Sequence, residues 1–484
     1  MKNVYIMLVV SDKKNETEPN KMGTNLSISP QGFVILYLQQ SKFKSMGKGT
    51  NFSGQPVLSQ LIKLMDRQKI NTLASKTGSN RYVKHLDGYS HLVVMLYAVL
   101  CNLRSLREVC LGFEANATRM NHFGLDHMIC RSTLSDANKR RSSSFFGSIY
   151  SLLLRKFAHV LSDSRTRHET ATKIFIMDST TITLFSEILK GAGRNSENGR
   201  KKGGIKAHTI IQEDIDLPIF VDFTAAARSD HELMKRIFCL PKNSFVVFDM
   251  GYNDYLIWKQ LSETGYKFVT RQKDNARFSI IENRRCPEKD IIADQIIELS
   301  FNKLVKRPLT EEEMSHRRGR RPKSGVVEVR EYVKGTYRCR RIVRRTDDGK
   351  DTVTFITNVL DQNEMSAEQI CETYRRRWAI ECLFKKLKQN FPLKYFLGDN
   401  VNAIEIQIWV TMIAYLLLRV MQHKAKCKLA FSNIVTLARL TIGNYINFVT
   451  LLNCPKLAWT ERLRYWNSLE STQNKVQLEL RFSP

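Results

Sequence analysis

Two aspartates follow apolar runs that have the pattern of buried strands. Asp178 ends the run over residues 173–178, and Asp249 comes directly after the run over residues 244–248. A carboxylate is costly to bury at such a position unless a cation compensates its charge. If the two strands are neighbours, their ends bring both carboxylates close together, so we expect a cation to lie between them.

A third carboxylate, Glu381, lies on a helix that we expect over residues 367–389, after a capping-box pattern at residues 366–369. At 100° per residue, an arc of about 60° on this helix holds four polar residues of different kinds, beside an apolar stripe. These four residues are Tyr374, Arg377, Glu381 and Lys388. An ordinary solvated face with i,i+4 pairs such as Arg377–Glu381 is the alternative interpretation.

Two aspartates and one glutamate form an oxygen-only ligand set that suits Mg²⁺ better than zinc. Two such ions, roughly 3.5–4 Å apart, can activate a water or a 3′-hydroxyl and stabilise the leaving oxygen. We expect Mg²⁺ as the cofactor, with Mn²⁺ able to substitute. The surrounding Lys and Arg side chains would hold a phosphodiester backbone.

The charge of the whole chain also indicates a polyanionic partner. Its 484 residues include 76 Lys and Arg against 47 Asp and Glu, a formal charge of +29, which attracts phosphate backbones from a distance. Ten cysteines without a CxxC pair argue against a zinc ribbon or a disulfide scaffold, so we expect reduced thiols and a cytoplasmic location. The longest apolar run, residues 408–418, is shorter than the roughly 18 residues that span a membrane. We therefore predict a buried core helix there and no membrane partner.

Changes in the sequence pattern along the chain predict an α/β protein with helical regions at both ends. The expected parts are a leader of undefined structure over 1–45, with Met46 as an alternative start; a helical DNA-binding domain over 46–168; an α/β core over 169–283 and 346–425; a basic β insertion over 284–345; and a helical C-terminal region over 426–484.

The helical N-terminal part contains short helices, a turn and a basic helix start. Ser105 begins a capping-box pattern, and another helix is expected near Ser132, followed by Lys139 and Arg140. This order is compatible with a helix-turn-helix-like DNA reader in which Lys139 and Arg140 contact DNA. A helical bundle with a solvated basic face is the alternative.

The predicted insertion is strongly basic. Residues 317–345 include twelve Lys or Arg and two acids, and the stretches 326–333 and 337–343 alternate like half-buried strands. We expect Arg340 and Arg341 in the second stretch to contact DNA phosphates.

The residues together resemble the DDE transposases of bacterial insertion sequences. The spacing Tyr374-x2-Arg377-x3-Glu381-x6-Lys388 matches the Tyr–Arg–Glu–Lys signature of that family, and the sequences around Asp178 and Asp249 are also similar. The resemblance covers roughly residues 50–430. It implies a ribonuclease H-like catalytic core that is interrupted by a β insertion before the catalytic glutamate.

The same resemblance implies roles for the residues in the motifs. Asp178, Asp249 and Glu381 would be the catalytic, metal-binding triad, and Tyr374, Arg377 and Lys388 would contact DNA at the ends of the element. Trp378 also matches the family, and we expect it to serve as a platform for a splayed nucleotide, with a buried core position as the alternative.

Two residues on a predicted core strand, Lys206 and His208, are candidate accessory groups, with a plain polar strand edge as the equally good alternative. The sequence thus predicts a cut-and-paste transposase that binds the terminal inverted repeats of its element and target DNA, as a homodimer in a synaptic complex. Its expected location is the bacterial cytoplasm, at the nucleoid when bound to DNA. The alternatives are a ribonuclease H-like nuclease without strand transfer and a catalytically inactive, transposase-derived DNA-binding protein.

Overall fold

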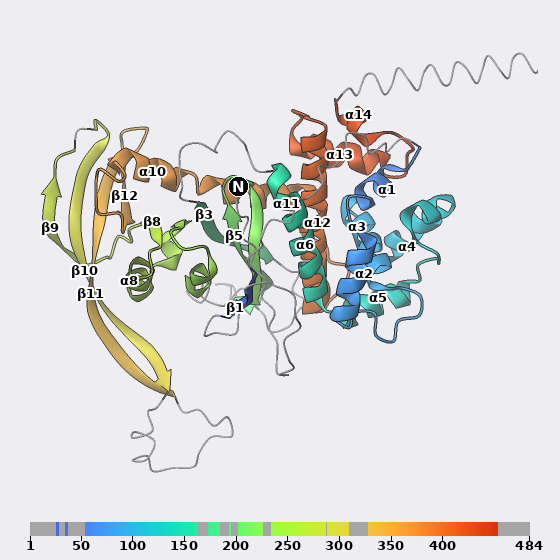
Figure 1. Cartoon of the computed structure of the whole chain (residues 1–484), viewed down its shortest axis with the longest axis horizontal. Helices are drawn as coiled ribbons and strands as arrows, with labels where there is room; N and C mark the ends of the chain where they lie inside the picture. Colours follow the sequence, from blue (N-terminus) through green and yellow to red (C-terminus); the bar gives the residue numbers. More distant parts are fainter. Residues whose placement is uncertain are drawn as a thin grey trace, which may run out of the picture.

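The structure is a computed structural model, and it describes residues 26–28, 34–36, 54–161, 173–183, 193–194, 202–225, 234–286, 288–308 and 328–453. Helices gather at one end of the protein and a large sheet forms the other (Figure 1). The expected start at Met46 and the C-terminal residues 454–484 lie outside the described residues. Within the expected leader, only the short strands β1 (Leu26–Ile28) and β2 (Val34–Leu36) are described.

The N-terminal part is helical, as predicted. It contains α1 (Val57–Ile62), α2 (Arg67–Lys76), α3 (Gly88–Leu100), α4 (Leu106–Glu114), the 3-10 helix η1 (Ala117–Phe123), α5 (Arg131–Arg140) and α6 (Ser143–Leu161). The helix start predicted at Ser105 is confirmed, because the Ser105 hydroxyl accepts from the Glu108 amide at 3.2 Å. The Glu108 carboxylate accepts from the Arg104 amide at 2.8 Å, one residue before the N-cap, so only half of the predicted capping box is present. The helix expected near Ser132 is α5.

A long apolar helix, α12 (Val401–Lys424), runs through the middle of the protein (Figure 1). It contacts α3, α6, α13 (Phe431–Thr441) and α14 (Phe448–Asn453). By length and composition alone it is able to cross a membrane, but most of it is buried inside the protein. The prediction of a buried core helix over residues 408–418 is therefore confirmed.

The sheet is mixed, which agrees with the predicted α/β class. Its described strands follow the order β4-β5-β3-β7-β8-β12-β11-β10-β9, and β6 also pairs with β5. Neighbours pair antiparallel except that β3, β7 and β8 run parallel to one another. The strands are β3 (Ile174–Thr183), β4 (Gly193–Arg194), β5 (Lys202–Gln212), β6 (Leu217–Ala225), β7 (Phe245–Phe248), β8 (Lys267–Arg271), β9 (Phe278–Arg284), β10 (Ile291–Pro308), β11 (Glu328–Arg345) and β12 (Thr352–Thr357).

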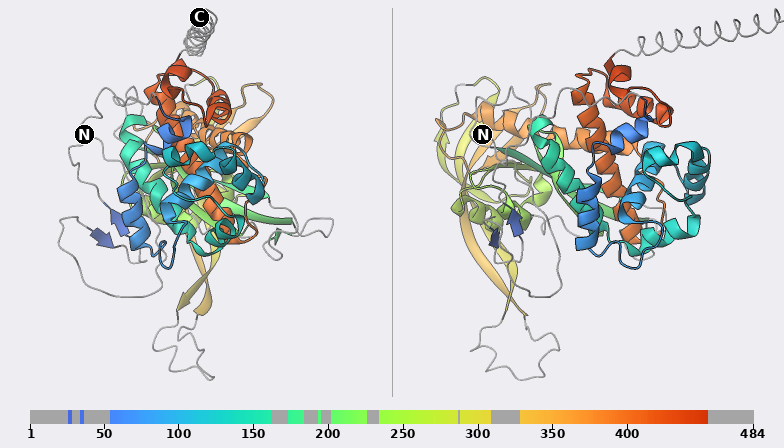
Figure 2. Two further views of the ribbon diagram at one scale, coloured as in Figure 1. Left: turned by 90° about the vertical axis from the view of Figure 1, so that its right-hand side faces the viewer. Right: turned by 45° about the vertical axis from the view of Figure 1, so that its right-hand side comes forward.

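The basic region forms a long hairpin of β10 and β11 that extends away from the body of the protein (Figures 1 and 2). The strand character expected at 326–333 and 337–343 is confirmed over the described residues, which form one continuous strand, β11, from Glu328 to Arg345. Gly335 lies between the two stretches and pairs with Phe301, whose ring lies close enough to fill the space of a side chain. An aromatic ring over a strand glycine replaces the missing packing, which explains why the strand continues. β11 also pairs with β12, so the hairpin prolongs the core sheet.

Candidate active site

The two aspartates lie side by side on parallel strands. β3 and β7 are neighbours, and Met177 is opposite Phe248 at the end of their pairing. Asp178 and Asp249 are the next residues, so their carboxylates line the same cleft. β3 does not end at Asp178, however, because it continues along β5 to Thr183.

The helix that carries the third carboxylate is broken, which corrects the prediction of one helix over residues 367–389. The structure has α10 (Ala367–Arg375) and α11 (Trp378–Asn390) instead. Between them the Arg377 amide donates to the Tyr374 carbonyl at 2.9 Å and the Ile380 amide donates to the Arg377 carbonyl at 3.2 Å. These i→i−3 bonds form a tight turn, a feature that often marks a functional position inside a helix. The predicted capping box, Ser366 with Gln369, is present at the start of α10.

Arg377 lies at this turn and joins two of the carboxylates. Its Nη1 is 3.0 Å from Oδ2 of Asp178, and its Nη2 is 2.5 Å from Oε1 of Glu381. The Tyr374 hydroxyl donates to Oδ1 of Asp249 at 3.4 Å, and Nζ of Lys388 donates to the Thr181 carbonyl at 3.1 Å.

The structure therefore brings the three carboxylates, Arg377 and Lys388 into one open cleft of about 570 Å³. The lining residues are Asp178, Ser179, Thr180, Asp249, Arg377, Glu381, Phe384, Lys385, Lys388 and Gln389.

Electrostatics in the cleft favours added positive charge. The pKa of Asp178 is raised to about 6, chiefly by burial. The Ser179 amide and Arg377 act to lower this pKa, and the Asp249 and Glu381 carboxylates act to raise it. Burial raises the pKa of Tyr374 to about 12, so its hydroxyl is protonated at neutral pH and can donate. Burial also lowers the pKa of Lys388. A cation that approaches Asp178 would stabilise its charged form.

The donor chemistry of the cleft fits a hard divalent cation, because every carboxylate there offers oxygen only. Among the residues that the structure describes, no group of three or more acidic, histidine or cysteine side chains is arranged to hold a metal ion. The guanidinium of Arg377 forms ion pairs with both Asp178 and Glu381 and partly neutralises them. A cation bound by the three carboxylates would take over that neutralising role.

Trp378, at the start of α11, has 63% of its surface exposed. The alternative of a buried core residue is therefore wrong for this side chain. An exposed indole beside Arg377 remains available to contact a partner.

Arg340 corrects the expectation of a phosphate contact. Its side chain is 0% exposed and forms an ion pair with Asp294, with Nε to Oδ1 at 2.8 Å and Nη2 to Oδ2 at 2.7 Å. A guanidinium enclosed in this way cannot reach DNA. Its neighbour Arg341 is only partly buried and donates to the side chains of Gln272 and Gln295.

The accessory candidates Lys206 and His208 lie on the wrong face. Asp178 pairs with Thr209, and His208 pairs with Ser179. Paired residues of antiparallel strands share a face and successive residues alternate, so Lys206 and His208 lie on the face of β5 opposite to that of Asp178.

The two basic candidates of the N-terminal part, Lys139 and Arg140, end α5 and are exposed. Arg140 forms a surface ion pair with Asp136 at 2.9 Å. Nothing in these contacts prevents either side chain from meeting DNA.

Sequence reasoning missed Lys385, which lines the cleft. At 100° per residue it lies about 20° from Tyr374 on the helix, next to the polar arc. The same geometry that singled out Glu381 and Lys388 was therefore sufficient to find it.

Comparisons with known proteins identify one family of similar proteins. The family model described as "Transposase DDE domain" matches residues 169–417, and one described as a domain of unknown function matches residues 53–126. A Sinorhizobium fredii protein named as transposase y4zB is 30% identical over 292 residues, 59% of this chain and 70% of that protein. A Geobacillus stearothermophilus protein named as a transposase for insertion sequence element IS5377 is 27% identical over 52% of this chain and 57% of that protein.

Two further similarities are more distant. A Synechocystis protein named as a transposase for insertion sequence element IS4SA is 23% identical over 69% of this chain and 80% of that protein. The solved structure of the piggyBac transposase synaptic complex with hairpin DNA aligns with 83% of this chain and 82% of that chain. Its sequence identity is 9% and its TM-score is 0.37, a similarity too low to indicate a shared mechanism.

Proposed function

The chain belongs to the family of DDE transposases of bacterial insertion sequences, and on this premise we propose that it cuts and joins DNA in transposition. It binds the terminal inverted repeats of its element, cleaves the strands there and transfers the freed 3′-hydroxyl to target DNA. The observation that carries this proposal is the cleft in which Asp178, Asp249 and Glu381 meet Arg377 and Lys388.

The proposed core is ribonuclease H-like. In the order β6-β5-β3-β7-β8, the strands β6, β5 and β3 pair antiparallel, and β7 and β8 run parallel to β3. This arrangement supports the assignment, and so does the position of the carboxylates on β3, after β7 and on α11.

In the proposed reaction the water oxygen attacks the phosphorus at the end of the element, the P–O3′ bond breaks, and the 3′ oxygen leaves with a proton. The new 3′-hydroxyl then attacks a target phosphodiester, whose own P–O3′ bond breaks. Asp178, Asp249 and Glu381 would hold divalent cations, which when bound would activate the attacking oxygen and stabilise the leaving oxygen. The Tyr374 hydroxyl holds the Asp249 carboxylate, and Arg377 and Lys388 supply positive charge for the phosphate oxygens.

DNA is held over a larger surface than the cleft. We propose that the exposed ends of Lys139 and Arg140, the partly buried Arg341 and the exposed indole of Trp378 contribute to it. The net charge of +29 supports a polyanionic partner. We propose that two copies act together on paired element ends.

The test is a nicking assay on DNA that carries the ends of the element, in Mg²⁺ or Mn²⁺. Asp249→Asn and Glu381→Gln should each abolish nicking while leaving end binding nearly unchanged, because each removes ligand charge but little volume. Asp274→Asn and Glu372→Gln, two exposed acids outside the cleft, are the matched controls and should nick normally. Full activity of either cleft variant would show that the carboxylate assignment is wrong.

The products separate the alternatives. Joining of the cleaved end to target DNA supports a transposase, whereas nicking without joining and without end specificity would indicate a nuclease. Binding to ends without any nicking by the unaltered protein would indicate an inactive DNA-binding derivative.

A further inference from the structure

Asp294 and Arg340 form an ion pair that is buried in the hairpin, where neither DNA nor solvent reaches the two charges. The two side chains are 1% and 0% exposed. They lie on the adjacent strands β10 and β11, where Arg340 pairs with Ile296 and Asp294 with Ile342, so the ion pair runs diagonally across the hairpin. Such a pair is weak evidence for stability by itself, because desolvation offsets much of the attraction.

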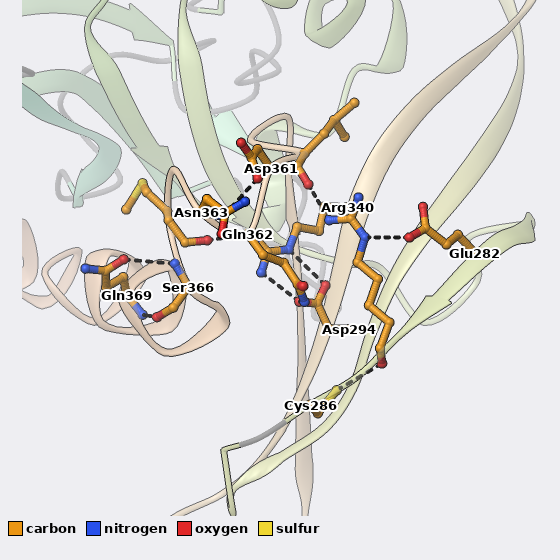
Figure 3. Close-up of polar contacts among 12 residues, drawn as sticks. Glu282, Cys286, Asp294, Arg340, Asp361, Gln362, Asn363, Ser366 and Gln369 are labelled. Carbon is orange, nitrogen blue, oxygen red and sulfur yellow. Dashed lines mark hydrogen bonds and ion pairs between the residues drawn. The ribbon is translucent and has the colours of Figure 1, made fainter.

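The pair also binds a loop outside the hairpin (Figure 3). Gln362 donates through Nε2 to Oδ2 of Asp294 at 2.6 Å, and Nη1 of Arg340 donates to the Met365 carbonyl at 2.7 Å. On the third strand, β9, Nη1 of Arg284 donates to the Leu360 carbonyl. The three neighbouring strands β9, β10 and β11 therefore each contact the single loop over residues 360–366.

That loop leads directly into the helices of the cleft. Met365 precedes Ser366, the N-cap of α10, and α10 carries Tyr374 just before the turn at Arg377. A nine-residue helix is a rigid rod of about 13 Å, so a shift at its start moves its far end. The side chains that meet Asp249, Asp178 and Glu381 are located at that far end.

We propose that Arg340 is a positioning residue, which with Asp294 and Gln362 anchors the start of α10 so that Tyr374, Arg377 and Glu381 reach the cleft. The basic region thereby acts on the reaction through the helix as well as through any DNA contact. The role of Arg340 in catalysis rests on the proposed function, whereas the role of Arg340 in ordering α10 does not.

The test compares four variants by hydrogen exchange and by nicking. The variant Arg340→Met with Asp294→Leu removes both charges together and keeps the volume, so no unpaired charge is left in the core. Arg340→Lys keeps a charge beside Asp294 but cannot bind that carboxylate and the Met365 carbonyl at once with a planar fork. Gln362→Ala removes a direct contact to the loop. Arg338→Met, an exposed arginine on the same strand, is the control.

The same result is expected in three variants: the double variant, Arg340→Lys alone and Gln362→Ala alone. In each of them, amides of residues 366–381 should exchange about tenfold faster or more. Amides of α8 (Tyr255–Glu263), which packs on β10 and β11, should exchange as in the unaltered protein. The rate of nicking should fall by about ten- to a hundredfold while the Kd for end DNA stays within about twofold. Arg338→Met should leave the exchange rates of residues 366–381 and of α8 as in the unaltered protein.

Unchanged exchange in residues 366–381 would overturn the proposal. Equal loosening of α8 and of residues 366–381 would also overturn it, because Arg340 would then only hold the hairpin together. If the unaltered protein does not nick DNA, the proposed function fails, and the exchange rates still decide whether Arg340 orders α10.

Discussion

Replacing Asp178 by Asn should change how the stability of the metal-free protein depends on pH. The pKa of this carboxyl in the folded protein is about 6, against an ordinary value of 3.8, and burial is the largest cause. Since the folded protein then binds the proton more tightly than the unfolded chain, the free energy of unfolding falls as the pH rises from about 4 to about 6. Asn cannot ionise, so the variant loses this dependence.

The size of the effect follows from the pKa. A rise of about two pH units, at about 1.4 kcal/mol each, corresponds to about 3 kcal/mol in all. About 2 kcal/mol of that falls between pH 4.5 and pH 7.5. The stability of Asp178→Asn relative to the unaltered protein should therefore increase by about 2 kcal/mol across this range.

The measurement is urea unfolding at several pH values from 4.5 to 7.5, with EDTA present. Asp274→Asn, which changes an exposed aspartate, is the control. Its plot of the free energy of unfolding against pH should run parallel to that of the unaltered protein. If the Asp178→Asn curve is also parallel to that of the unaltered protein at every pH, burial in the cleft does not raise the pKa of the Asp178 carboxyl. The electrostatic argument for a cation site would then fail.

Three further results are expected. Arg377→Ala should bind Mn²⁺ more tightly than the unaltered protein in the absence of DNA, because the guanidinium no longer neutralises Asp178 and Glu381. Binding is measured from the electron paramagnetic resonance signal of free Mn²⁺, and equal or weaker binding would contradict this prediction. Arg341→Ala should flatten the plot of log K for DNA against log salt by up to about 0.9, and an unchanged slope would exclude a phosphate contact. Trp378→Ala should keep the melting temperature, because the indole is 63% exposed. It should also slow the steps that need a splayed nucleotide, since a base stack contributes about 1–3 kcal/mol, and equal single-turnover cleavage of both strands would argue against the stack.

The elements that carry the site could be predicted because their local patterns are strong. Apolar runs that end in Asp178 and Asp249 indicate strands, and the capping box at Ser366 indicates a helix start; the structure has β3, β7 and α10 there. Helical geometry also placed Glu381 beside Arg377. The break between α10 and α11 could not be predicted, because no Gly or Pro occupies it and the turn is held by contacts to the distant Asp178.

The residue types and their spacing were thus sufficient to determine the family signature, the basic character and the three carboxylates. Only the tertiary structure decided which of the many charges are buried and which face the cleft. Arg340 and Arg341 are adjacent in the sequence, yet one is enclosed by Asp294 and the other meets glutamine side chains. Lys206 and His208 lie on β5, next to β3, but on the face of the sheet opposite to that of Asp178. Strand register sets both outcomes, since a shift of one residue moves every side chain to the other face. That register depends on pairing between segments far apart in the chain, which local sequence patterns do not encode.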